Sequence, residues 1–138
     1  MDMKNDGKIR HIGISNVDLT QLETALRETE VVSVQNAFNV QHSWNVEILN
    51  YCTINSIPFL PWMPLGDGSI SWTDPTLCNL GKKYAVLPAQ IALAALINLS
   101  PIMLPIPGTS SSKHLHENVA AAELKLDDED MSTLWKQR

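Results

Sequence analysis

The sequence is poor in cysteine, and the cysteines it has are not clustered. Its 138 residues include only Cys52 and Cys78, which lie far apart and in no spacing typical of metal ligands. Two isolated cysteines argue against a disulfide-stapled secreted domain and against a structural zinc site. The sequence therefore predicts reduced thiols in a cytoplasmic protein.

The chain also lacks long hydrophobic runs and a surplus of basic residues. No apolar run approaches the length needed to span a membrane, and the opening MDMKNDGK does not resemble a signal peptide. Ten basic residues face 15 acidic ones, giving a net charge of −5, which disfavours nucleic acid and anionic membranes as partners. Because no low-complexity or Gly/Ser-rich linker interrupts the sequence, we expect one domain over residues 1–138.

What the sequence does contain is a regular alternation of strand and helix patterns. Short apolar runs predict strands at residues 8–14, 31–34, 57–62 and 102–104. Helical patterns follow them, beginning near Asp18, Asn45, Asp74, Ser110–Ser112 and Asp127, with a restart at Pro88 and a strongly apolar stretch over 90–97. Strands that alternate with helices predict an α/β fold with a parallel sheet and right-handed crossovers.

The stretch after the fourth strand is the most suggestive single segment. A strand that delivers a Gly108/Thr109/Ser110 loop onto a helix start can bind an anion, because free N–H groups and the helix dipole point at it. Lys113 and His114 add positive charge to that turn. The same pattern also fits an ordinary, well-capped strand–loop–helix connection without a ligand.

Polar or Gly/Pro groups follow each of the four predicted strands. They are Ser15-Asn16, Gln35-Asn36, residues 62–67 and residues 107–112. In parallel sheets and barrels, ligands bind at the carboxyl ends of the strands. We therefore expect the four groups to converge on one edge and to form a ligand site there.

Four segments in this order resemble the C-terminal half of an aldo/keto reductase. They are GKIRHIGISN at 7–16, SVQNAFNV at 33–40, IPFLPWMPLGDG at 57–68, and PAQIALAALINLSPIMLPIPGTSSSKHLHENVAAAELKL at 88–126. The resemblance runs from about residue 7 to 130 and implies strands five to eight of a (β/α)8 TIM barrel. It thus implies a partial barrel of four consecutive parallel βα units, a half-barrel, and the family reaction of NADPH-dependent carbonyl reduction.

The resemblance also implies a cofactor site for NADP(H). Ser15, Asn16 and Gln35 match the family residues that hold the nicotinamide carboxamide, and Trp62 matches the aromatic residue that stacks on the nicotinamide. Each position also has an alternative without a ligand. Ser15 and Asn16 could cap the following helix, Gln35 could be a paired amide at a strand end, and Trp62 could be a core residue. The remaining matches are Met63, Pro64, Leu65, Gly66 and Asp67 along the pyrophosphate, Ile106, Pro107, Gly108, Thr109 and Ser110 at the adenosine end, Lys113 and His114 at the phosphate, and Glu117 and Asn118 at the adenine.

The sequence departs from the family pattern in two ways. Many members place a lysine and an arginine where this chain has Gly108 and His114, so the discrimination for NADP over NAD is expected to be weaker. The family's catalytic Asp, Tyr, Lys and His belong to the first half of the barrel, and neither Tyr51 nor Tyr84 matches the catalytic tyrosine. We therefore predict no catalytic residue here, and no metal either, because His114 and His116 lack a third ligand nearby.

Three interpretations remain open at this stage. The chain is an aldo/keto reductase fragment (truncated or split), a catalytically inactive nucleotide-binding or accessory module, or a structural remnant without a ligand. Four strands cannot close such a barrel, so the chain is expected to associate with a second half-barrel chain or with itself. Gln41–Trp44 and residues 69–73 are predicted as pocket loops.

Overall fold

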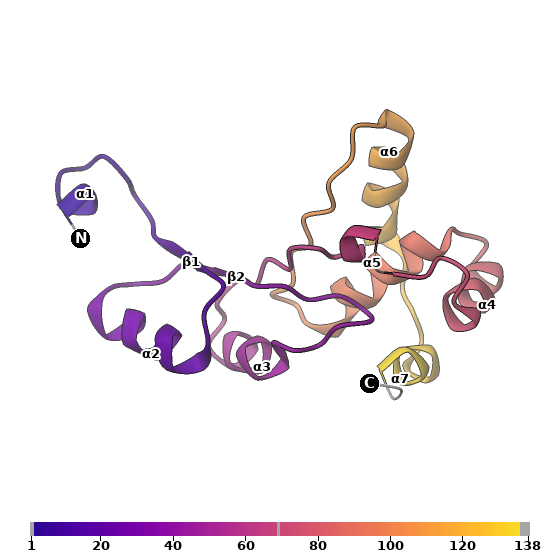
Figure 1. The fold of residues 1–138 in the computed structure, drawn as a ribbon, viewed down its shortest axis with the longest axis horizontal. Coiled ribbons are helices and arrows are strands. Elements are labelled where there is room, and N and C mark those ends of the chain that lie inside the picture. The colour runs from indigo at the N-terminus through magenta and orange to yellow at the C-terminus, as the bar shows by residue number, and fades with distance from the viewer. Residues whose placement is uncertain (1, 69, 136–138) are drawn as a thin grey trace.

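The computed structural model describes residues 2–68 and 70–135. Figure 1 shows an elongated arrangement in which α1 lies at one end of the molecule, apart from the other helices. The elements are α1 (Asp2–Asn5), β1 (Gly13–Ser15), α2 (Leu19–Glu28), β2 (Ser33–Gln35), α3 (Val46–Ile54), the 3-10 turn η1 (Gly66–Gly68), α4 (Pro75–Tyr84), α5 (Pro88–Leu99), α6 (Ser112–Ala120), the 3-10 turn η2 (Ala121–Glu123) and α7 (Asp128–Trp135).

The sheet is parallel, as the alternating pattern predicted. β1 pairs with β2 in the register Gly13↔Ser33 to Ser15↔Gln35. Parallel bridges then connect Val34 to Phe59 and Phe59 to Met103, so the four segments lie side by side in chain order. The fourth segment pairs over its predicted residues, because Phe59 exchanges backbone hydrogen bonds with Ile102 and Leu104. The third segment forms only isolated bridges at Phe59 and Trp62, since Pro58 and Pro61 lack the backbone N–H that a continuous ladder would need.

The first two strands approach each other closely at Gly13. A Cβ atom at this position would collide with the Ser33 hydroxyl. A side chain at position 13 would require the Ser33 hydroxyl to move, which confirms the close approach that the sequence predicted at Gly13.

The helices begin where capping residues predict. Asp18 accepts a hydrogen bond from the Gln21 backbone N–H at 2.8 Å, and the Gln21 side chain accepts one from the Asp18 N–H at 2.9 Å. Asp74 caps α4, with Pro75 as its first residue, and Ser111 accepts from the His114 N–H at 3.4 Å to cap α6. Each cap satisfies an amide that the first helical turn would otherwise leave unpaired.

Two hydrophobic clusters hold the fold together. The first lies between the sheet and helices α2 and α3 and includes Phe38 and Phe59, whose rings meet edge to face at 6.0 Å. The second joins α4, α5 and α7 and includes the fully buried residues Ile91, Ala92, Ala94 and Ala95 of α5. Trp135 packs against both clusters, with its ring centroid 5.8 Å from that of Phe38.

Helix α6 differs from the sequence-based expectation. Its period predicted an inward face formed by Leu115, Val119 and the following Ala122, yet Leu115 and Val119 are 53% and 65% exposed. These residues line a cavity of about 460 Å³ with Leu93, Ile97 and Leu104. The helical period finds an apolar face, but within the described residues no further element packs over it.

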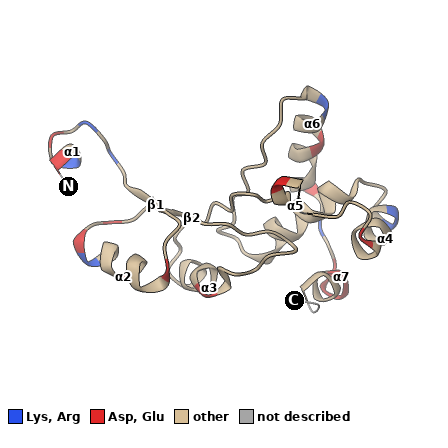
Figure 2. Ribbon diagram, in the orientation of Figure 1, with Lys and Arg blue, Asp and Glu red and all other residues tan. Residues whose placement is uncertain are grey.

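Charged residues gather on the outer helices and loops rather than on the strands (Figure 2). Among the described residues, no single helix has both the length and the apolar composition needed to cross a membrane. Helices α4 and α5 satisfy those criteria only as a pair, and they are bent by 89° relative to each other.

Candidate functional site

The polar groups at the ends of β1 and β2 contact each other directly. The Ser15 hydroxyl donates to the Gln35 carbonyl oxygen at 2.8 Å, and the Asn16 backbone N–H donates to the same oxygen at 3.0 Å. Asn16 adopts a left-handed conformation with φ 55°, which asparagine tolerates better than most residues. The chain therefore turns sharply after β1, with Asn16 at the strand end.

Trp62 joins this group from the third strand segment. Its indole Nε1 donates a hydrogen bond to the Asn16 side-chain oxygen at 2.8 Å. The Trp62 backbone N–H donates to the Asn36 carbonyl at 3.1 Å, which fixes the tryptophan against the end of β2. The structure thus brings together Ser15, Asn16, Gln35 and Trp62, as the convergence of strand ends predicted.

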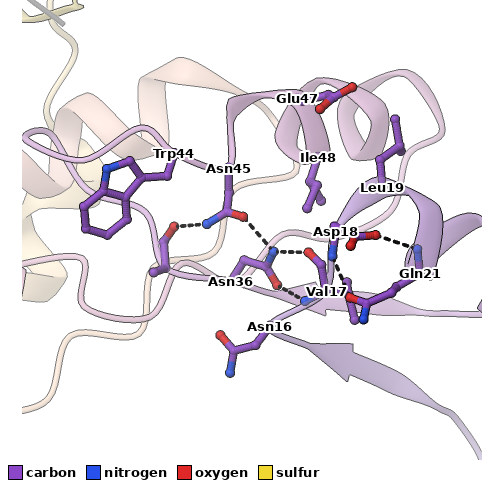
Figure 3. A pocket seen from close by; sticks show the side chains of 11 residues that line it. Asn16, Val17, Asp18, Leu19, Gln21, Asn36, Trp44, Asn45, Glu47 and Ile48 are labelled. Carbon is purple, nitrogen blue, oxygen red and sulfur yellow. Dashed lines mark hydrogen bonds between the residues drawn. The ribbon is translucent and has the colours of Figure 1, made fainter.

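A network of buried amides supports this edge. Asn36 is 2% exposed; its side chain donates to the Val17 carbonyl at 2.7 Å and accepts from the Val17 N–H at 3.2 Å. It also donates to the Asn45 side chain, which in turn donates to the Ala37 carbonyl (Figure 3). The sequence analysis gave Asn36 no role separate from that of Gln35 and treated Asn45 only as a helix start.

The loop at 63–68 is held in an unusual backbone conformation. Met63, Gly66, Asp67 and Gly68 all have positive φ angles, at 53°, 73°, 45° and 86°. For residues with a side chain, such conformations cost about 1–3 kcal/mol each and tend to collect at functional sites. Of the five non-glycine residues with positive φ in the described chain, Asn16, Met63 and Asp67 belong to the predicted site.

The buried side chain of Asn39 hydrogen-bonds to this loop. It is 2% exposed, and its side-chain amide donates to the Met63 carbonyl at 3.1 Å. Its side-chain oxygen accepts from the backbone N–H groups of Gln41 and His42, both at 2.9 Å. A single buried amide therefore couples the 63–68 loop to the loop after β2, and sequence reasoning did not assign it this role.

The loop at 63–68 faces the loop at 106–110 across a cavity. A space of about 330 Å³ is lined by Met63, Pro64, Leu65, Asp67, Gly68, Trp72, Ile106, Pro107 and Gly108. A neighbouring space of about 230 Å³ is lined by Leu65, Trp72, Leu87, Ala89, Gln90, Gly108, Thr109, His114, Glu117 and Asn118. Because both are lined by Leu65, Trp72 and Gly108, the two spaces lie next to each other, and we refer to them together as the hollow.

Of the residues predicted to contact the adenosine half of the cofactor, some line the hollow and others do not. His114, Glu117 and Asn118 line the smaller space, and Thr109 lies beside them. Ser110 is exposed on the loop, and Lys113 is an exposed cation whose Nζ lies 3.8 Å from the Glu117 carboxylate. Asn118 therefore lines the hollow, whereas Asn16 and Trp62, which contact each other, line neither of its two spaces.

The predicted pocket loop at 41–44 carries an aromatic pair. The rings of His42 and Trp44 stack at 4.3 Å with an interplanar angle of 19°. Trp44 is 70% exposed and lines a separate cavity of about 460 Å³ with Asn16 and Asn45 (Figure 3). Of the other predicted pocket loop, Ser69 lies outside the described residues, and Trp72 lines the hollow described above.

The tyrosine whose pKa is shifted, Tyr84, does not line the hollow. The Tyr84 hydroxyl donates to the Asp130 carboxylate, which raises the pKa of the tyrosine above its ordinary value. Lys83 contacts Asp127 at 2.8 Å and Asp130 at 2.6 Å, and these two contacts raise the lysine pKa. This cluster joins α4 to α7. No group of three or more metal-ligating residues occurs within 2–68 and 70–135.

A parallel α/β fold with its candidate site at the carboxyl edge defines the general class, and comparison with known proteins defines the family. The profile described as "Aldo/keto reductase family" matches residues 1–137. The chain belongs to the aldo/keto reductase family, which confirms the resemblance found in the sequence.

Individual relatives agree with this assignment. The chain is 42% identical over 127 residues to an uncharacterized oxidoreductase of Schizosaccharomyces pombe, covering 92% of this chain and 42% of the relative. It is 40% identical over 133 residues to pyridoxine 4-dehydrogenase of Escherichia coli, covering 96% and 46%. The chain spans about half the length of the curated relatives it matches.

Solved structures show the same fold. A thermostable aldo-keto reductase in complex with the inhibitor epalrestat matches with a TM-score of 0.93 and 30% identity, over 99% of this chain and 52% of that one. An aldo-keto reductase from Klebsiella pneumoniae in complex with NADPH matches with a TM-score of 0.86 and 26% identity, over 99% and 50%.

Proposed function

We propose that this chain is the NADP(H)-binding part of an aldo/keto reductase, built as four βα units of a half-barrel. The reaction of the completed protein is then NADPH-dependent carbonyl reduction. The observation that carries the proposal is the hydrogen bond from Trp62 to Asn16, because Trp62 directly precedes the 63–68 loop that lines the hollow. We propose that this aromatic ring, its amide partner and the hollow form one extended groove.

The residues in this groove fit a nicotinamide dinucleotide. Ser15, Asn16 and Gln35 offer the donors and acceptors that a carboxamide requires, and the half-buried Trp62 offers a ring face. The positive-φ backbone of the 63–68 loop and the first turn of α6 are backbone arrangements of the kind that bind phosphate oxygens. The K. pneumoniae neighbour was crystallised with NADPH, which supports the same ligand class here.

Each part of the chain then has a defined task toward the cofactor. Residues 15, 16, 35 and 62 orient the nicotinamide, and residues 63–67 and 106–110 follow the pyrophosphate and the adenosine. Lys113 and His114 neutralise phosphate charge, and Glu117 and Asn118 recognise the adenine. Bound NADPH supplies the hydride, while the residues of this chain bind and orient it.

Titration with NADPH tests this function. We expect a saturable heat of binding in calorimetry and a saturable change in tryptophan emission. Trp62→Ala should weaken binding severalfold, whereas Ile54→Ala, which removes an exposed apolar side chain of α3 that lines neither space of the hollow, should not. Absence of any saturable heat with the unaltered chain would refute the proposal.

The proposed half-barrel requires a partner. The sheet ends at β1 on one side and at the Met103 segment on the other, so two parallel edges are open within the described residues. Beside the second edge lies the apolar cavity lined by Leu104, Leu115 and Val119. We therefore propose that a complementary half-barrel, or else a second copy, covers this edge.

Sedimentation analysis tests the association. We expect the chain alone to self-associate or to unfold without cooperativity, and Leu115→Asp to raise its solubility by removing an exposed apolar contact. A monodisperse monomer that melts cooperatively would contradict this part of the proposal.

The second candidate is a nucleotide-binding or accessory module without chemistry of its own. Neither tyrosine reaches the rim, since Tyr84 is engaged by Asp130 and Tyr51 packs against the first core cluster. NADPH oxidation with an aldehyde should be absent for the chain alone. Activity on addition of a half that carries the catalytic Asp, Tyr, Lys and His would favour the first candidate.

Both cysteines are free, which supports a reducing compartment such as the cytoplasm.

A further inference from the structure

Trp72 stands at the junction of the two spaces that make up the hollow. It lines the space between the 63–68 and 106–108 loops and also the space beside α6. Its side chain is 40% exposed and belongs to neither hydrophobic cluster. Core packing therefore does not account for a large aromatic residue at this position.

The position of Trp72 is fixed by its neighbours in the chain. The Cys78 thiol donates to the Trp72 carbonyl at 3.3 Å, which ties the segment to α4. The flanking Ser71 and Thr73 hydroxyls hydrogen-bond to each other at 3.0 Å, and the Asp74 N–H donates to the Ser71 carbonyl at 3.0 Å. The backbone that carries the Trp72 indole is thus tethered, so less backbone freedom is lost when a ligand binds beside it.

Polar groups suited to a planar heterocycle line the smaller space beside Trp72. Glu117 and Asn118 come from α6, and Gln90 comes from the start of α5. The Gln90 side chain donates to the Glu117 carbonyl at 3.0 Å, which fixes the two helices relative to each other. A ring face together with amide and carboxylate groups is the combination that binds a nucleobase by stacking and by edge hydrogen bonds.

We infer that Trp72 stacks on the adenine ring of the bound dinucleotide and so adds a cofactor contact beyond the residues carried over from the family pattern. The inference rests on the proposed NADP(H) function. Trp62 and Trp72 then occupy opposite ends of the same ligand, one beside Asn16 and the other beside Asn118. The remaining tryptophans are placed differently, because Trp44 stacks on His42 and Trp135 packs between the core clusters.

Adenosine 2′,5′-bisphosphate isolates this end of the ligand, because it lacks the nicotinamide. Calorimetry should show that Trp72→Ala weakens its binding about fivefold or more, the effect expected for loss of one base–aromatic stack. Trp72→Phe keeps a ring and should retain most of the affinity. Trp44→Ala is the matched control and should bind like the unaltered chain.

A second measurement does not depend on the folding of the alanine variant. The bisphosphate should quench tryptophan emission in the unaltered chain and in Trp44→Phe, but the quenching should be lost in Trp72→Phe. Reduced nicotinamide mononucleotide should bind the unaltered chain and Trp72→Ala equally. If NADPH binds but Trp72→Ala and Trp72→Phe leave the bisphosphate affinity and quenching unchanged, the stacking role is wrong and the proposed function stands. If the unaltered chain binds neither NADPH nor the bisphosphate, both are wrong.

Discussion

The indole nitrogen of Trp62 and the side-chain oxygen of Asn16 lie 2.8 Å apart, although 46 positions separate the two residues in the sequence. The contact links the end of the first strand to the end of the third segment, across β2. It makes the orientation of the Trp62 ring depend on Asn16.

Asn16→Ala tests this dependence. Removing the acceptor leaves the indole N–H without its partner and removes an amide that is proposed to bind the nicotinamide carboxamide. One lost hydrogen bond of about 0.5–1.5 kcal/mol should weaken NADPH binding roughly two- to tenfold. The emission maximum of Trp62 should shift as well. Asn50→Ala, on the exposed face of α3, is the control, and equal affinities for the two variants would contradict the role of Asn16.

His114→Arg tests the weak discrimination between NADP and NAD. A guanidinium offers two parallel hydrogen bonds to a phosphate, which the imidazole of His114 cannot. We expect the ratio of the NADH and NADPH dissociation constants to rise about tenfold, the effect of roughly 1.4 kcal/mol from one charge-assisted contact.

His116→Arg is the matched control for this substitution. It adds the same charge two residues further along α6, where the histidine ring contacts the Ser112 carbonyl and does not line the hollow. An identical change in both variants would show that net charge, rather than a specific contact at position 114, sets the preference.

Gly13→Ala tests the close approach between the first two strands. The added methyl group would meet the Ser33 hydroxyl, and overpacking of this kind typically costs about 1–3 kcal/mol of stability. Denaturant unfolding should therefore show a lower midpoint. The double variant Gly13→Ala/Ser33→Ala removes the obstructing hydroxyl and should recover most of the loss; no recovery would place the strain elsewhere.

The Lys83 cluster predicts a pH dependence of stability. Hydrogen bonding to Lys83 is the largest cause of the lowered Asp127 pKa. A lowered carboxyl pKa adds stability above the unfolded-state value, and this contribution is lost as the pH falls through the folded-state value. The raised Tyr84 pKa, caused chiefly by its hydrogen bond to Asp130, adds stability below the ordinary tyrosine value that is lost at alkaline pH.

Melting temperatures measured across the acid range can isolate the lysine. Lys83→Ala should flatten the acid part of the profile, because the carboxylate then has no cation to favour its charged form. Lys82→Ala removes an exposed neighbouring charge outside the cluster and should keep the profile of the unaltered chain. Parallel profiles for Lys83→Ala and the unaltered chain would contradict the assignment.

Local sequence signals predicted the helices better than the strands. Capping residues such as Asp18, Asp74 and Ser111 define helix starts through hydrogen bonds to the residue three positions later. Such local contacts can be predicted from the sequence. Strand length depends on backbone partners far away in the chain. β1 therefore spans Gly13–Ser15 and overlaps the predicted 8–14 segment only at Gly13 and Ile14.

The sequence predicted which polar residues lie at the strand ends, but not the buried side chains that hold the site's loops in place. Polar strand ends indicated the rim at Asn16 and Trp62, since parallel strands bring such ends together. The buried amide of Asn39 acts through a tertiary contact that no local spacing reveals. Trp72 lies in the 69–73 segment that was predicted as a pocket loop, but its place between two cavities was not predicted. The same limit explains α6, where periodicity found an apolar face but could not show that Leu115 and Val119 would stay exposed.

The position of Trp135 has a consequence for biosynthesis. Its ring touches both hydrophobic clusters, one made largely from the first half of the chain and the other from the second. A growing polypeptide cannot make this connection until nearly all of the described residues have left the ribosome. We expect the first cluster to remain loosely packed during translation, and accessible to chaperones, until α7 is synthesised and Trp135 packs against it.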